Sequence, residues 1–507
     1  MRQVNRWTVL IVLSAALAII SLDNTIVNVA LPRLQEDLGA TTAQLQWVVD
    51  AYSVMFAGSL LLAGSLGDRF GRRKMLLIGL LTFTMGSLLA IFVSHASTLT
   101  LCRALMGVGG AFIMPSTLSI LVQVFQEPKE RARAIGIWAA VAGLGVAIGP
   151  IVGGLLLEHF TWHAIFWVNP PIAMLVIVAV LIFVPESADV SKPRLDLIGA
   201  LLSGLGLVAL VVTIIELPEF GVDGFTITVA AFSMLFLVGF VVWEKRVARP
   251  LLPMQYFKER LFSSSIVIVA MVYFALMGAM FFLPQFLQLV KGMSPLQSGI
   301  AVLPGAGGLL LASLVSPLLA EKFGTRRLVV IGMSVVTAGM LAFSYLTIDT
   351  PYVSIAVVFG SIGAGLGLTL PQATNGVLAS VPTERSGMGS AVNDAMGELG
   401  GSFGVAILGT TMSIFYRQNI EQAIVDAGDK ITLLPPHAIE AARESLAAAS
   451  IEAARIPESI GAVYQEVAGH AFVTGMTSAL FIGSVITFFG VLIAWKFLPQ
   501  HVERFEE

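Results

Sequence analysis

Three ionisable residues, Asp23, Asp50 and Arg103, lie inside long apolar stretches of this 507-residue chain. A charge placed in such a stretch costs roughly 2.5–3.5 kcal/mol on membrane-insertion scales, so these residues need an explanation. If the stretches are helices, which rise about 1.5 Å per residue, all three lie at a similar depth. A carboxylate beside Arg103 stays ionised until its partner withdraws or water is excluded. The three residues therefore suit reversible proton binding; the alternative is a static ion pair that orders the helices.

Two further acids, Asp394 and Glu398, are four residues apart and would share one face of a helix. Two carboxylates on a helix that faces a cavity would attract an organic cation and could exchange it for protons. The alternative is that one of them, in its protonated form, donates a hydrogen bond in helix packing.

The composition of the chain places these residues in a membrane. The chain is 56% hydrophobic and only 12% charged, too few charges to cover a soluble protein of this size. The single cysteine, Cys102, excludes a disulfide framework. No Gly-Lys dipeptide is present to form an ATP phosphate loop, and the His residues are scattered. We therefore expect no cofactor, no metal and no enzymatic activity, with protons as the coupling ion.

Runs of about twenty apolar residues recur along the chain and predict an all-α, polytopic membrane protein with fourteen spans. An even number of spans puts both termini on one side. Lys and Arg gather on that side, so the positive-inside rule makes both termini cytoplasmic. The predicted spans are 8–31, 45–63, 75–94, 98–122, 133–157, 163–184, 196–217, 225–243, 262–289, 297–319, 327–347, 352–377, 388–415 and 471–498.

A short polar segment between two spans occurs twice in the chain. The first hinge, residues 64–74, reads GSLGDRFGRRK, and the second hinge, residues 319–327, reads LAEKFGTRR. Gly71 of the first hinge aligns with Gly324 of the second, and the loop sequences PKER and PTER match at nearly the same spacing. Internal duplication of this kind is typical of secondary transporters, whose substrate site lies between the repeats.

The repeat predicts a division of the chain into three parts. Residues 1–190 would form one six-helix bundle, 191–260 an inserted helix pair with cytoplasmic linkers, and 261–507 a second six-helix bundle. The second bundle contains a long external segment, 416–470. Within it, the stretch His437–Arg455 is predicted to be helical, either as a cap on the external mouth or as a solvated connector.

The first hinge resembles the signature loop of the major facilitator superfamily. The stretch Leu22–Pro32 resembles a first-span motif of its fourteen-span drug:proton antiporters, and Trp162–Pro170 is similar to a segment of the same branch. The superfamily's antiporter motif is matched by Gly145, Gly149, Pro150, Gly153 and Gly154. The resemblance implies a major facilitator fold with two six-helix bundles plus two inserted helices.

The resemblance also assigns roles to residues. It implies that Asp23 and Arg103 carry proton coupling, to which we add Asp50. It implies that the hinge, with Asp68 at a helix N-terminus of the opposite half, closes the cytoplasmic side. The predicted gating residues are Gly64, Asp68, Arg69, Gly71, Arg72, Gly145, Gly149, Pro150, Gly153 and Gly154. The predicted substrate-binding residues are Asp394, Glu398, Asn24, Asn28, Tyr52, Trp138 and Phe274.

The expected function is multidrug efflux by alternating access: export of small amphipathic, cationic organic compounds in exchange for protons. The protein would act as a monomer among membrane lipids, with no nucleic-acid partner. One alternative is export of an endogenous lipid, peptide, siderophore or amino-acid-derived metabolite on the same scaffold. A receptor or lipid-flipping scaffold would need no proton response. The stripe of Gly145, Gly149 and Gly153, which belongs to the matched antiporter motif, disfavours an importing symporter. Dication exporters of the family can carry an acid in the span 297–319, and this chain has none there.

Overall fold

The structure, a computed structural model, describes residues 5–187, 196–247, 250, 254–381, 386–427, 434–453 and 455–500, apart from some side chains within helices. Across these residues every regular element is a helix, which confirms the predicted all-α class. An N-terminal set comprises α1 (Arg6–Leu38), α2 (Thr42–Phe70), α3 (Arg72–Ala90), α4 (Ala96–Val124), α5 (Pro128–His159), α6 (Ala164–Trp167) and α7 (Asn169–Phe183). Two helices follow it, α8 (Leu197–Phe220) and α9 (Gly224–Glu244).

A C-terminal set completes the fold. It comprises η1 (Tyr256–Lys258), α10 (Arg260–Gln285), the π-helical turn η2 (Phe286–Val290), α11 (Pro295–Ala301), α12 (Leu303–Phe323), α13 (Thr325–Phe343), α14 (Tyr352–Ala379), α15 (Ser386–Ala427), α16 (Pro436–Glu444), α17 (Leu446–Ala453) and α18 (Glu458–Phe497). The division at 190 and 260 stays a prediction.

Twelve of the described helical segments are long and apolar enough to cross a membrane, as in a multi-pass membrane protein. The other two predicted spans fall on α2, a helix of 29 residues, and on α5, whose apolar part Gly143–His159 is shorter. The count of fourteen therefore stays a prediction. The span predicted at 163–184 divides into α6 and α7 just before two prolines, which cannot continue a helical hydrogen-bond ladder.

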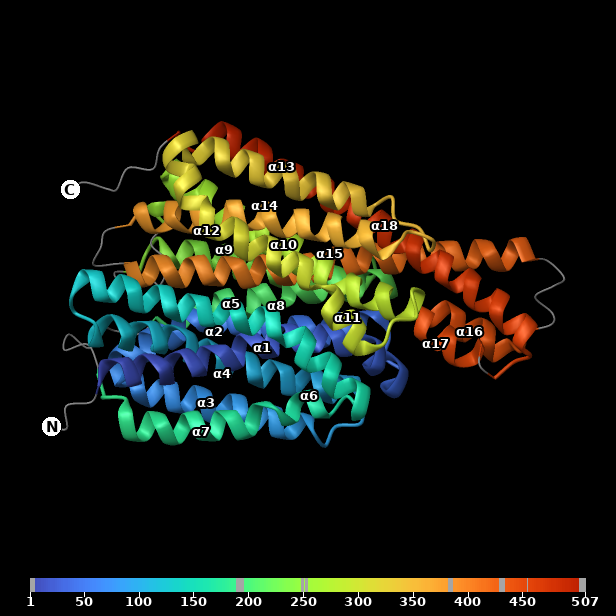
Figure 1. Cartoon of the computed structure of the whole chain (residues 1–507), viewed down its shortest axis with the longest axis horizontal. Helices are drawn as coiled ribbons and strands as arrows, with labels where there is room; N and C mark the ends of the chain where they lie inside the picture. The colour runs from blue at the N-terminus through green and yellow to red at the C-terminus, as the bar shows by residue number, and fades with distance from the viewer. Residues whose placement is uncertain are drawn as a thin grey trace.

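The helices run lengthwise between two ends of an elongated bundle (Figure 1). Arg6 at the start of α1 forms an ion pair with Glu130 at the start of α5. Arg326 at the start of α13 donates to the carbonyl of Leu498, directly after α18. We call this the terminal end. Helices α16 and α17 stand at the opposite, distal end (Figure 1).

The two hinges have the same backbone conformation. Gly71 ends α2 with φ 114° and ψ 126°, and Gly324 ends α12 with φ 84° and ψ 148°. L side chains rarely adopt positive φ, so each turn favours glycine. The next helix, α3 or α13, begins at the following residue. The sequence repeat is therefore also a structural repeat.

Helix α8 lies against both sets, since it packs on α2 and on α15. Trp47 of α2 donates through Nε1 to Oε1 of Glu216 at 2.9 Å, and the hydroxyl of Thr410 of α15 donates to the carbonyl of Ile214 at 2.9 Å. A small apolar cluster joins the same three helices through Val54, Val211, Ile215 and Ala406. Helix α9 packs on α8, and many of its large apolar side chains are exposed.

The stretch His437–Arg455, predicted to be helical, is helical over most of its described residues and is divided into two helices, α16 and α17. Ser445, between α16 and α17, is extended with φ −172° and ψ 162°. The hydroxyl of Tyr416 on α15 donates to the carbonyl of Ala442 at 2.7 Å, and that of Tyr464 on α18 donates to the carbonyl of Ala438. These contacts dock α16 onto α15 and α18.

Candidate functional site

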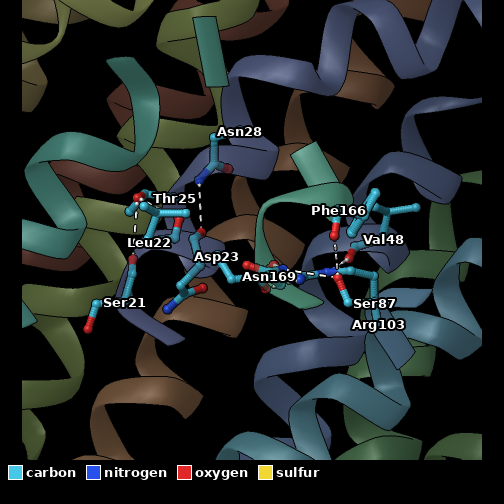
Figure 2. Close-up of polar contacts among 11 residues, drawn as sticks. Ser21, Leu22, Asp23, Thr25, Asn28, Val48, Ser87, Arg103, Phe166 and Asn169 are labelled. Carbon is cyan, nitrogen blue, oxygen red and sulfur yellow. Dashed lines mark hydrogen bonds and ion pairs between the residues drawn. The ribbon is translucent and has the colours of Figure 1, made fainter. Parts of the chain in front are cut away.

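The candidate site is built around an ion pair between Arg103 of α4 and Asp23 of α1 (Figure 2). Nη1 of Arg103 donates to Oδ2 of Asp23, and the two residues are 1% and 0% exposed. The structure therefore brings together two residues that the sequence placed at one depth. Their role in proton coupling stays a prediction.

Two contacts from α2 fix the guanidinium group. Nε of Arg103 donates to the carbonyl of Val48 at 3.2 Å, and the group lies 4.6 Å from the ring centroid of Tyr52. A cation over an aromatic ring is attracted by its negative face. Glycines on α4 make room for Tyr52: a Cβ at Gly107 would meet its backbone carbonyl oxygen at 2.2 Å, and one at Gly110 its side-chain hydroxyl at 2.8 Å. Tyr52, predicted to bind substrate, is thus fully buried against Arg103.

A second partner of Asp23 was missed at the sequence level. Asn169, the first residue of α7, donates through Nδ2 to Oδ1 of Asp23 at 2.7 Å. The same amide group donates to Oγ of Ser87 on α3 at 3.1 Å (Figure 2). Asn169 belongs to the stretch that carried the family resemblance, and its place directly before Pro170 was the available signal.

Asp50 is not part of this ion pair, because its side chain faces the C-terminal set of helices. Its carboxyl group is opposite the hydroxyl of Ser402 on α15. Asp50 is 0% exposed, and neither of its oxygens has a hydrogen-bond partner of standard geometry among the described residues. Asp50 therefore lies in the interface between the two sets.

The acids of α15, Asp394 and Glu398, are both half-buried, as expected for residues on one face. Asn393 donates to Oδ1 of Asp394 at 3.2 Å. The carboxyl group of Glu398 lies beside the hydroxyl of Ser53 on α2 and within electrostatic range of Arg103. Glu398, the predicted substrate acid, therefore interacts electrostatically with Arg103 of the predicted coupling pair.

The other predicted substrate residues are mostly enclosed in this conformation. Asn24 is half-buried, and its carbonyl accepts a hydrogen bond from Nδ2 of Asn28 at 3.3 Å. Asn28, Trp138 and Phe274 are buried. The backbone of Phe274 packs against α15, since a Cβ at Gly404 would meet its carbonyl oxygen at 2.3 Å. Whether these residues bind substrate stays a prediction.

The first hinge is bound to its own set of helices. Arg72 donates through Nη1 to the carbonyl of Ser119 on α4 at 3.3 Å, and its backbone amide donates to the carbonyl of Ser187 at 2.7 Å. Arg69 is exposed, with its guanidinium group 5.4 Å from the ring centroid of Phe70. Gly64 lies on α2 near Pro115. The side chain of Asp68 is outside the described residues.

The predicted antiporter motif of α5 contacts two different partners. A Cβ at Gly145, Gly149 or Gly153 would meet atoms of α1, and the closest approach is 2.1 Å, from Gly149 to the hydroxyl of Thr25. These three glycines therefore permit close packing of α1 on α5. Gly154 and Pro150 instead face α11 of the C-terminal set.

The two sets are joined near the distal end. Gln46 of α2 donates through Nε2 to the carbonyls of Val405 and Ala406 on α15, at 3.2 and 3.1 Å. Gln288 of η2 donates to the carbonyl of Val29 on α1 at 2.9 Å. Together with the crossing of α5 and α11, these bonds close the interface at that end.

Comparison with known proteins identifies the family. The model of the Major Facilitator Superfamily matches residues 13–405. The chain belongs to this superfamily. It is 37% identical to the multidrug efflux pump LfrA of Mycolicibacterium smegmatis, over 95% of this chain and 94% of that protein. It is 29% identical to the methyl viologen resistance protein SmvA of Salmonella typhimurium, over 94% of each.

A solved structure supports the same fold. The bacterial homologue of the human lysosomal transporter Spinster, in an inward-facing and unoccupied conformation, has a TM-score of 0.69 and 18% identity, and 97% of each chain is covered. At this identity the likeness concerns the fold alone. It agrees with a major facilitator arrangement of the helices.

Proposed function

We propose that this protein is a monomeric antiporter that exports small amphipathic organic cations from the cytoplasm in exchange for protons. The observation that carries the proposal is the buried pair of Asp23 and Arg103. Apolar residues would often stabilise such a position as well as a buried ion pair, so its presence is better explained by function than by stability. The relatives named as efflux and resistance proteins support the direction of transport.

The proposed cycle is alternating access between the two sets of helices. Lys and Arg gather at the terminal end, which the positive-inside rule assigns to the cytoplasm. The conformation described here, joined at the distal end, is then the one closed to the outside. Opening that end would separate α2 from α15 and expose Asp50 to external water, which suits a role for Asp50 in proton uptake.

Proton binding and substrate binding would be coupled because Arg103 interacts with both Asp23 and Glu398. Protonation of Asp23 would remove the charge that compensates Arg103. The guanidinium charge would then act more strongly on Glu398, which lies within electrostatic range. A cationic substrate held by Glu398 would meet a competing positive charge and be released. Asp394, one helical turn away, would hold the second charge of a divalent cation.

The proposal is tested with inverted membrane vesicles that carry a proton gradient. Monovalent cations, divalent cations and neutral analogues of the same shape are added, and dissipation of the gradient is followed. We expect cations to dissipate it and neutral analogues to do so less. If no compound in the panel dissipated the proton gradient, the proposal would be rejected.

A double variant separates coupling from structure. Asp23→Asn combined with Arg103→Gln removes both charges and keeps a polar side chain at each position. If the pair only orders the helices, the double variant should recover the transport that Asp23→Asn alone loses. We expect it to remain uncoupled.

A further inference from the structure

The break between α6 and α7 places a polar network beside Asp23. Pro170 has no N–H, so the carbonyl of Phe166, four residues earlier, is left without its usual helical partner. That carbonyl accepts a hydrogen bond from Oγ of Ser87 at 2.8 Å. Ser87 is thereby fixed as an acceptor for Asn169, which is 1% exposed.

Only one of the two polar atoms of the Asn169 side-chain amide, the nitrogen, forms hydrogen bonds among the described residues. Its Nδ2 donates both to Asp23 and to Ser87, while its Oδ1 is buried with no hydrogen-bond partner among the described residues (Figure 2). A buried polar atom without a partner costs about 1–3 kcal/mol, so its persistence calls for a reason. An asparagine side chain offers both two donors and an acceptor.

We propose that Asn169 is a positioning residue that holds the carboxyl group of Asp23 in its ionised form. This inference rests on the proposed proton coupling through Asp23. In the ionised form the carboxylate accepts from Nδ2, as the structure has it. The unpartnered Oδ1 is the cost of aiming Nδ2 at both Asp23 and Ser87.

Ser87 fixes the amide in this orientation. Its single hydroxyl hydrogen is donated to the carbonyl of Phe166, so toward Asn169 its oxygen can only accept. The charged or titratable groups that face the site are Arg103, Tyr52 and, across the interface, Glu398. None of them offers Asp23 a neutral amide donor.

The test uses the purified protein in liposomes with an imposed proton gradient and ethidium, a monovalent cationic dye. Transport is measured across a range of pH for the wild type and for Asn169→Leu, which has nearly the same shape and no hydrogen-bonding group. Loss of a hydrogen bond to the carboxylate should raise the pH of half-maximal transport by about 1–2 units. Asn419→Leu, which removes an amide bonded to the carbonyl of Phe415 in α15, should keep the wild-type profile.

Each outcome decides the inference. An Asn169→Leu profile that matches the wild type would overturn it. If that variant does not reach the membrane, Asn169→Asp takes its place. It adds a second negative charge beside Asp23, so it should shift the profile in the same direction, and an unshifted profile would again overturn the inference. A wild type that does not respond to the proton gradient would instead reject the proposed function.

Discussion

The crossing of α5 and α11 gives a sharp test of conformational coupling. A Cβ at Gly299 of α11 would lie 2.2 Å from the carbonyl oxygen of Pro150, and one at Gly154 of α5 would lie 2.6 Å from that of Pro295. Both contacts are with backbone atoms, which cannot move aside by a change of rotamer. Gly299→Ala should therefore destabilise the conformation that is closed at the distal end.

The magnitude follows from the cost of overpacking. An extra methyl group in a tightly packed contact typically costs about 1–3 kcal/mol. Since about 1.4 kcal/mol corresponds to a tenfold change in an equilibrium constant, the population open at the distal end should rise about 5- to 150-fold. The folded core of each set is not affected, because the contact lies between the sets.

The assay is cysteine labelling from outside the cell. Cys102 is replaced by Ala, and Ser402→Cys provides a single reporter that is buried in the interface with α2. An impermeant maleimide should label it faster in Gly299→Ala. The matched control is Gly307→Ala on α12, where an added Cβ has no atom within 4 Å. Equal labelling of the two variants at equal membrane levels would refute the reasoning.

Three further predictions concern the site and the hinge. Asp23→Asn leaves Arg103 buried without its charge partner, so proton-driven efflux should be lost and stability reduced by about 3–5 kcal/mol, seen as a lower melting temperature. Retained gradient-driven efflux would contradict this. Arg72→Ala should increase labelling from the cytoplasmic side with substrate affinity unchanged; lost affinity with unchanged labelling would argue for a binding role. Glu398→Gln should impair efflux of all cationic dyes and Asp394→Asn that of divalent dyes most, and wild-type rates in both variants would make these acids structural.

The sequence could predict how deep a residue lies in the membrane, because each residue of a helix adds a fixed rise along the helix axis. That fixed rise placed Asp23 and Arg103 in one layer, and the structure brings them into contact. The repeated hinge likewise predicted that Gly71 and Gly324 turn alike, since the same loop chemistry recurs between corresponding helices.

Rotation about each helix axis could not be predicted, because it depends on which neighbours a helix meets. Asp50 shares the depth of Asp23 but faces Ser402 in the other set. The antiporter motif of α5 likewise meets two helices, since Gly153 faces α1 and the adjacent Gly154 faces α11. Asn169 was missed for the same reason: neither composition nor spacing links it to an acid far away in the chain.

Helix α8 has a consequence for how a compound dissolved in the bilayer could reach the space between the sets. Among the contacts between the sets are two lines, one between α2 and α15 and the other between α5 and the α11–α12 segment. Through Ile214 and Glu216, α8 spans the first line and shields it from lipid tails. A compound dissolved in the bilayer should therefore reach the space between the sets from one side only. A lipid-soluble substrate would enter beside α5 and α12, and bulky side chains introduced there should slow its capture from the bilayer more than its capture from water.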